Sequence, residues 1–189
     1  MTHHATEDIA VMRSLPNMSV YAPFDPIDAE CAIADALHTN HPCYIRLERN
    51  NEKIYNIENR DINHIVEIKS GKNVAVVSYG SIVEEAIAAS SICSEIGIYS
   101  ITKLKPIDEH TIVSIMNEYE TIISLEEHNI IGGLYSILAD IKSKYDIKCG
   151  LKHLSINDEY PSIVGNQKFL RNFFKIDSHA ICKLIADLT

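Results

Sequence analysis

Apolar residues recur along the chain in two spacings, one typical of helices and one of buried strands. In the first third, a short helix is expected after Thr6 and a second from Asp25-Pro26 to about Leu37. Asp25 suits the helix cap and Pro26 the first helical position, where a missing N–H costs nothing. Short strands are expected at 19–23 and 43–47. The first third therefore reads as helix, strand, helix, strand.

From residue 49 to 72 the sequence is polar with few helix signals, and we interpret 53–72 as a linker that could hold a short strand. From Asn73 the alternation becomes regular. The segment NVAVVSY is nearly all apolar and β-branched, which is typical of a strand covered on both faces. Ser81 and Glu84 have the spacing of a capping box. Further strands are expected at 96–101, 121–125 and 152–156, and helices at 81–95, 108–119, 131–145 and 177–188.

Alternating strands and helices with short connections predict an α/β fold. Residues 73–189 are expected to form one domain, a three-layer sandwich with a largely parallel sheet. Residues 1–52 are expected to be the end of a preceding α/β domain, because the composition shifts at the linker.

Composition narrows the class of protein. The 189 residues are 46% hydrophobic and 23% charged, as in soluble globular proteins. The net charge of −9 argues against general binding to nucleic acid or to an anionic membrane, because both require an excess of basic residues. No run approaches the ~18 apolar residues of a membrane span, and MTHHATED does not resemble a signal peptide. We therefore expect a cytoplasmic protein whose scattered cysteines are buried free thiols: Cys31, Cys43, Cys93, Cys149 and Cys182.

Two arginines lie at or just past the end of an expected strand. In parallel sheets, ligands bind beyond the carboxyl ends of the strands, so Arg46 or Arg49 could bind a phosphate bidentately. The alternative is a surface arginine paired with Glu48 or Glu52. Spacing alone does not decide between the two.

The segment SLEEHNIIGGLYS places two carboxylates, a histidine and a glycine pair between an expected strand and an expected helix. Gly132 and Gly133 allow a tight turn and leave amides free at a helix start. Close packing or a turn at an interface explains the glycines equally well.

A third cluster lies at the amino terminus: His3, His4, Glu7 and Asp8. His4 and Asp8 stand one helical turn apart, which could suit a metal ion, but no third ligand follows at a fixed offset. A histidine just before a helix is also well placed for acid/base chemistry.

Together these segments resemble the transketolase-like, thiamine-diphosphate-dependent enzymes. The segment THHATEDIAVMRSLPNMSVYAPFDPIDAE resembles the end of that family's pyrimidine-binding domain, and PCYIRLERN resembles its final strand. Three further segments resemble the family's carboxyl-terminal domain: NVAVVSYGSIVEEA, ITKLKPIDEHTI and ISLEEHNIIGGLYS. The likeness covers essentially the whole chain. It is closest to separately encoded carboxyl-terminal subunits of bacterial transketolases, with 1-deoxyxylulose-5-phosphate synthase and the pyruvate dehydrogenase beta subunit more distant.

The resemblance implies roles for individual residues. His3 matches the active-site histidine that contacts substrate hydroxyls and assists proton transfer. Arg49 matches the arginine that binds the phosphate of a sugar phosphate, a role that suits a permanently charged guanidinium. His4 stands where relatives have His or Gln and is a weaker substrate-binding candidate, and Arg46 is expected to be structural.

The family's carboxyl-terminal domain packs at subunit contacts and does not hold the cofactor. We therefore expect Glu126, Gly132 and Gly133 to be structural or interfacial.

The resemblance also implies what lies outside these residues. The family's catalytic glutamate and aromatic pyrimidine pocket lie upstream of the Thr-His element, and no GDG…NN-type motif for diphosphate and metal occurs here. Thiamine diphosphate and Mg are thus expected in the complete enzyme, with neither binding tightly to this chain alone. The implied partners are a sugar phosphate and an amino-terminal subunit or further domains, in a homo- or hetero-oligomer. The edges of the shortened first sheet are expected to be exposed unless a partner covers them.

Three hypotheses remain at this point. The chain is the carboxyl-terminal part of a transketolase-type enzyme that is inactive without the other domains. Alternatively, it is a non-catalytic interaction or regulatory module that kept the fold. In the third hypothesis, it is an unrelated α/β ligand-binding domain.

Overall fold

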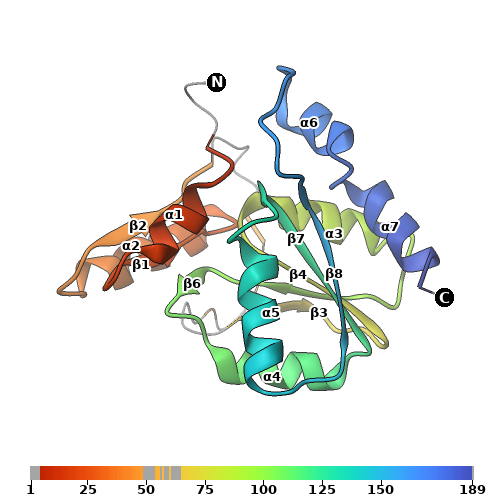
Figure 1. Cartoon of the computed structure of the whole chain (residues 1–189), viewed down its shortest axis with the longest axis horizontal. Helices are drawn as coiled ribbons and strands as arrows, with labels where there is room; N and C mark the ends of the chain where they lie inside the picture. Colours follow the sequence, from red (N-terminus) through yellow and green to blue (C-terminus); the bar gives the residue numbers. More distant parts are fainter. Residues whose placement is uncertain (1–4, 49–53, 56, 58–59, 61–64, 189) are drawn as a thin grey trace.

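The described residues of this computed structural model, 5–48, 54–55, 57, 60 and 65–188, form two β-sheets and their covering helices (Figure 1). The larger sheet has the order β3-β5-β4-β7-β8, built from β3 (Val66–Lys69), β4 (Val74–Ser78), β5 (Gly97–Ser100), β7 (Thr121–Asn129) and β8 (Gly150–Ile156). The smaller sheet has the order β2-β1-β6, built from β1 (Ser19–Tyr21), β2 (Cys43–Ile45) and β6 (Lys103–Lys105). The helices are α1 (Asp8–Ser14), α2 (Pro26–Leu37), the 3-10 turn η1 (Gly80–Ile82), α3 (Val83–Ala89), α4 (Glu109–Glu118), α5 (Leu134–Lys144), α6 (Gln167–Phe173) and α7 (Ser178–Ala186).

The five-stranded sheet is covered on both faces (Figure 1). On one face, α4 and α5 pack in a core cluster that includes Leu138 and Val77. On the other face, α3 and α7 pack in a second cluster that includes Ala86, Ile181 and Val76. Successive strand residues point to opposite faces, so the apolar β4 fills both layers. Among the described strands of this five-stranded sheet, β3 pairs antiparallel with β5 and the other pairs are parallel, which confirms the predicted three-layer α/β sandwich with a largely parallel sheet.

The small sheet joins the first part of the chain to the second. β1 pairs in parallel with β2, and on its other side it pairs antiparallel with β6, which follows β5 in the sequence. The expectation of an exposed edge is therefore wrong at β1, because a strand of the same chain occupies it. The two parts also share one core cluster, to which Ile9 and Val20 contribute from the first part and Tyr79 and Leu134 from the second.

The predicted linker is anchored to the start of α2. The Arg60 guanidinium donates to Asp25 at 2.5 and 2.7 Å, and the Tyr55 N–H donates to Asp25 at 3.0 Å. Burial alone would raise the pKa of Asp25, but these donors, Arg60 first, hold it below its ordinary value. Asp25 also accepts the N–H of Asp28 at 2.9 Å, as predicted for the cap. The linker range contains β3, and the division into 1–52, 53–72 and 73–189 remains a prediction.

The predicted capping box before α3 is wrong. Ser81 lies in η1, and its hydroxyl donates to Glu48 of the first part instead of capping a helix. Glu84 pairs with Arg171 on α6. The helix itself ends at Ala89, several residues earlier than expected.

The long strand β7 also departs from the prediction. It continues to Asn129 instead of ending near residue 125, so Glu126, Glu127 and His128 lie on the strand itself and not in a loop. β6 and α6 were not predicted at all. The carboxylates of β7 lie where the regular pairing with β8 is interrupted, between Leu125 and Asn129.

All five cysteines are free, but only Cys149 is buried. The other four are half-buried, so the prediction of buried thiols is wrong for them. None of the helices in the described ranges has the length and apolarity that crossing a bilayer requires.

Candidate functional site

Polar side chains gather where α1 and the end of β2 meet the carboxyl ends of β4 and β7. Ser78 of β4 pairs with Leu125 of β7, so the residues that follow, Tyr79 and Glu126, lie side by side. This is the edge of a parallel sheet at which ligands commonly bind. We call the set the polar junction: Asp8, Tyr44, Arg46, Glu48, Tyr79, Ser81, Glu126, Glu127, His128, Gln167 and Arg171.

The predicted catalytic residue His3 and the substrate-binding candidates Arg49 and His4 lie outside the described residues. Their described neighbours belong to the polar junction. Asp8 follows His4 by four residues in the sequence, and Glu48 immediately precedes Arg49.

Asp8 links the start of α1 to β2. The Tyr44 hydroxyl donates to Asp8 at 2.7 Å, and Arg46 Nη1 lies 3.7 Å from Asp8 Oδ1. Arg46 Nη2 also donates to the carbonyl oxygen of Glu127 at 3.0 Å, and its guanidinium carbon lies 5.9 Å from the centroid of the Tyr79 ring. Arg46 is therefore not a surface arginine paired with a neighbouring glutamate; it is enclosed between the two parts of the chain.

Glu48 ties the end of β2 to the second part of the chain. Its carboxylate accepts the Ser81 hydroxyl and the Nε2 of Gln167, the latter at 3.3 Å. The same Gln167 amide donates to Glu127 at 2.8 Å, so one side chain bridges two carboxylates. Burial, and then the charge of Glu127, raise the pKa of Glu48. The residue before Arg49 is thus held by donors from η1 and α6.

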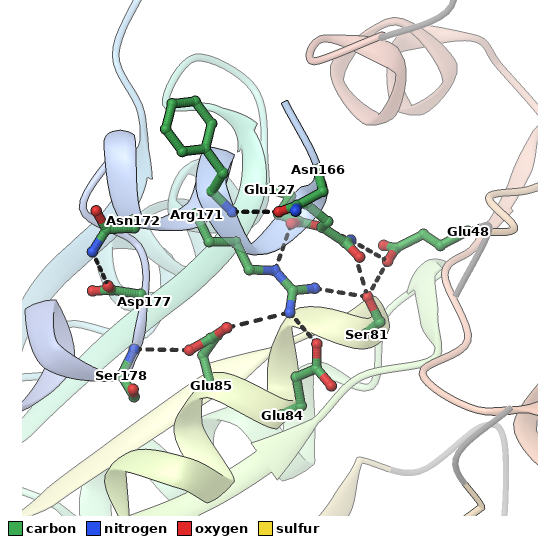
Figure 2. Close-up of polar contacts among 12 residues, drawn as sticks. Glu48, Ser81, Glu84, Glu85, Glu127, Asn166, Arg171, Asn172, Asp177 and Ser178 are labelled. Carbon is green, nitrogen blue, oxygen red and sulfur yellow. Dashed lines mark hydrogen bonds and ion pairs between the residues drawn. The ribbon is translucent and has the colours of Figure 1, made fainter. Parts of the chain in front are cut away.

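Arg171 is the central cation of the polar junction, with its side chain only 2% exposed (Figure 2). Its Nε donates to Glu127 at 2.6 Å and its Nη2 donates to Ser81 at 2.9 Å. Its Nη1 pairs with Glu84 and, at 3.4 Å, with Glu85. Burial alone would lower the Arg171 pKa, but these carboxylates, Glu127 first, raise it. The guanidinium therefore fastens α6 to both α3 and β7.

Glu126 caps α5 from the neighbouring strand. Its carboxylate accepts the N–H of Leu134 at 2.7 Å and of Tyr135 at 3.0 Å, and the Tyr79 hydroxyl donates to it at 3.2 Å. Gly133, at the N-cap position of α5, has no side chain that could accept these N–H groups. A carboxylate at the N-terminal end of the helix also complements the helix dipole. Burial raises the pKa of Glu126 to about 7.

The glycine pair forms the turn on which α1 rests. Gly132 has φ +78°, and a Cβ there would lie 2.6 Å from the Cβ of Ala10 on α1. A Cβ on Gly133 would lie 2.2 Å from Glu126 Oε2. Arg13 of α1 donates to the Gly132 carbonyl oxygen at 2.5 Å. The pair thus occupies the contact between the two parts of the chain.

His128 is fully buried and caps α1 from β7. Its Nε2 accepts the N–H of Ala10 at 3.3 Å, so Nδ1 carries the proton and donates to the Asn129 carbonyl oxygen at 2.6 Å. Burial lowers the pKa of His128, which favours the neutral ring that accepts this bond.

An open cleft of about 290 Å³ lies between α1 and the loop after β8. Its lining includes Val11, Ile131 and Tyr160, and its charged members are the carboxylates Glu7, Asp158 and Glu159. An acidic lining repels an anion, so this cleft does not suit a sugar phosphate.

The described residues provide no ligand set for a divalent ion. Within the described ranges, no three His, Cys, Asp or Glu side chains converge as metal ligands. Asp8, considered with His4 for such a role, instead contacts Tyr44 and Arg46.

Sequence reasoning missed the residues that hold the polar junction together, Arg171 and Gln167 on α6. One signal for α6 was available: Asn166 has a residue type favoured at helix caps, and its side chain accepts the N–H of Phe169 at 2.9 Å. Nothing local indicates that Arg171 reaches Glu127, because these residues are brought together only by the packing of α6 (Figure 2).

Comparisons with known proteins agree with this architecture. The family model described as "Transketolase, C-terminal domain" matches residues 63–181, and "Transketolase, pyrimidine binding domain" matches residues 1–53. A subunit of the apulose-4-phosphate transketolase from Actinobacillus succinogenes is 30% identical over 99% of this chain and 62% of its own length. The 1-deoxy-D-xylulose-5-phosphate synthase of Dictyoglomus thermophilum is 29% identical over 97% of this chain and 31% of its own length.

Among solved structures, one described as "Split gene transketolase, inactive beta4 tetramer" has a TM-score of 0.88 and 26% identity. The match covers 98% of this chain and 62% of that chain. The chain thus spans less than two thirds of the curated relatives it matches.

Proposed function

The chain belongs to the transketolase family, and on that basis we propose that it is the carboxyl-terminal part of an enzyme that transfers a two-carbon ketol unit between sugar phosphates. Support comes from the order of the two matching domains and from the similar protein that is itself one subunit of a transketolase. The similar structure described as an inactive tetramer of a split-gene transketolase supports a need for a partner.

In this proposal, the chain's own residues bind and orient the sugar phosphate. Arg49 holds the phosphate through charge-assisted hydrogen bonds. His3 contacts substrate hydroxyls and moves a proton at the reacting carbons, and His4 is the weaker candidate for a further contact. The observation that carries the assignment is the 2.7 Å hydrogen bond from Tyr44 to Asp8, because it joins the described flanks of the two segments that bear these residues.

Thiamine diphosphate, with Mg, would supply the carbanion chemistry that two-carbon transfer requires. We propose that both bind to an amino-terminal subunit or to further domains, and that this chain alone holds neither tightly. In this proposal, every step assigned to this chain concerns the sugar phosphate.

The polar junction fits a supporting role in this scheme. Arg171, Ser81 and Gln167 hold Glu48, which directly precedes Arg49. The contacts of Glu126, Gly132 and Gly133 favour a structural role at the base of α1 and α5. The chain would act in the cytoplasm within a homo- or hetero-oligomer.

Reconstitution tests the proposed function. The purified chain, the purified amino-terminal partner and their mixture are each supplied with thiamine diphosphate, Mg, a ketose phosphate donor and an aldose phosphate acceptor. We expect ketol transfer only in the mixture, and calorimetry should detect no tight cofactor binding by the chain alone. If the mixture forms a complex but transfers nothing, the alternative of a non-catalytic interaction or regulatory module replaces this proposal.

A further inference from the structure

Two cysteines far apart in the sequence meet on one face of the five-stranded sheet. Cys93 lies in the turn after α3, and Cys182 lies on α7, which packs against α3 in the same core cluster. The carbonyl oxygen of Ala89 accepts the N–H of Cys93 at 2.8 Å and the thiol of Cys182 at 3.8 Å. The Cys93 thiol is also the neighbour that, after burial, raises the pKa of the Cys182 thiol, so the two groups lie close together.

The pair is half-buried and not sealed in the core. Cys93 is itself half-buried and is flanked by the exposed residues Ile92 (67% exposed) and Ser94, so this turn lies at the surface. Cys149, by contrast, is buried in the core cluster on the other face of the sheet. A partly exposed thiol beside a second thiol can exchange with a small disulfide, whereas a thiol sealed in the core cannot.

We propose that Cys93 and Cys182 form a thiol–disulfide exchange site that takes a small-molecule disulfide, of the oxidised-glutathione type, and closes into an intramolecular disulfide. The Cys93 thiolate attacks one sulfur of the small disulfide, forms a mixed disulfide and releases one thiolate. The Cys182 thiolate then attacks the Cys93 sulfur and releases the second. The two protein thiols lose two protons and two electrons, and the small disulfide is reduced to two thiols.

The second step sets the pH dependence of the exchange. Burial raises the pKa of Cys182 to about 11, so this group is a thiol at neutral pH. Closure needs the Cys182 thiolate and therefore speeds up towards alkaline pH.

The closed form would fasten α7 to α3. The bond would enclose nearly half of the chain in one covalent loop, which restricts the unfolded state and stabilises the folded one. This proposal does not depend on the proposed enzymatic function, because it concerns only the helical layer formed by α3 and α7.

Peptide mapping tests the proposal directly. The full chain is incubated with oxidised glutathione at pH 7 and pH 9, alkylated, digested without reductant and measured by mass spectrometry. We expect a peptide that links Cys93 to Cys182, formed several-fold faster at pH 9, abolished by reductant and accompanied by a rise in Tm of roughly 5 °C or more.

Three variants complete the experiment. Cys93→Ser and Cys182→Ser should each abolish the linked peptide and the rise in Tm, and Cys182→Ser should retain a glutathione adduct on Cys93. The control Cys149→Ser should form the linked peptide as the wild type does. The proposal is overturned if Cys93 and Cys182 both stay fully alkylatable after oxidation, or if the only disulfides found join two copies of the chain.

Discussion

The Nη2 atom of Arg171 donates a hydrogen bond to the Oγ atom of Ser81 at 2.9 Å, and the Ser81 hydroxyl in turn donates to Glu48. This relay runs from α6, near the carboxyl terminus, to the end of β2 in the first part of the chain. The last described residue before Arg49 is therefore positioned by residues that lie far from it in the sequence.

Replacing Arg171 by Ala should lower the free energy of unfolding by about 1.5–3 kcal/mol, because it removes charge-assisted hydrogen bonds to half-buried carboxylates such as Glu127. Urea denaturation measures this loss. The control Lys148→Ala removes an exposed pair with Asp146 and should change the stability by at most about 0.5 kcal/mol. Equal effects of the two substitutions would show that Arg171 does not hold α6.

Gly133→Ala should cost about 1–3 kcal/mol, because its Cβ would meet Glu126 Oε2 at 2.2 Å and displace the cap of α5. Gly165→Ala is the matched control, since the atoms nearest to its Cβ belong to the ring of Phe169, a side chain that is 51% exposed and can shift towards solvent. Thermal denaturation should give the Gly133→Ala variant a clearly lower Tm than the Gly165→Ala variant. The reverse order would refute the packing described for the glycine turn.

The elements that depend on local sequence were predicted correctly, whereas those that depend on tertiary contacts were missed. The strand and helix pattern predicted the parallel sheet and its layers, since a nearly all-apolar strand such as β4 is expected to be buried on both faces. It missed β6, because Lys103–Lys105 gains its strand conformation only by pairing with β1. It also mistook Ser81 and Glu84 for a capping box, because their true partners, Glu48 and Arg171, are brought near only by tertiary packing.

Stability should depend on pH through Glu126. Burial raises its folded-state pKa from the ordinary value of 4.5 to about 7, so the folded state binds more protons between these values. The stability that this group contributes is complete below pH 4.5 and is lost as the pH rises through 7.

Glu126→Gln keeps the shape and removes the titration. The difference in free energy of unfolding, wild type minus variant, should therefore fall by about 1–3 kcal/mol between pH 4.5 and 7.5. Denaturant titrations at a series of pH values measure this difference. A difference that stays constant across the range contradicts the raised pKa.

The central claim is that this chain contributes the phosphate contact of a transketolase-type enzyme, and Arg49→Ala in the reconstituted enzyme tests it most directly. We predict a KM for the ketose phosphate that rises about 10-fold or more with kcat little changed, from the loss of charge-assisted hydrogen bonds. Lys72→Ala, which removes an exposed pair with Glu95, should leave both constants unchanged. An unchanged KM for the Arg49→Ala enzyme would contradict the assignment.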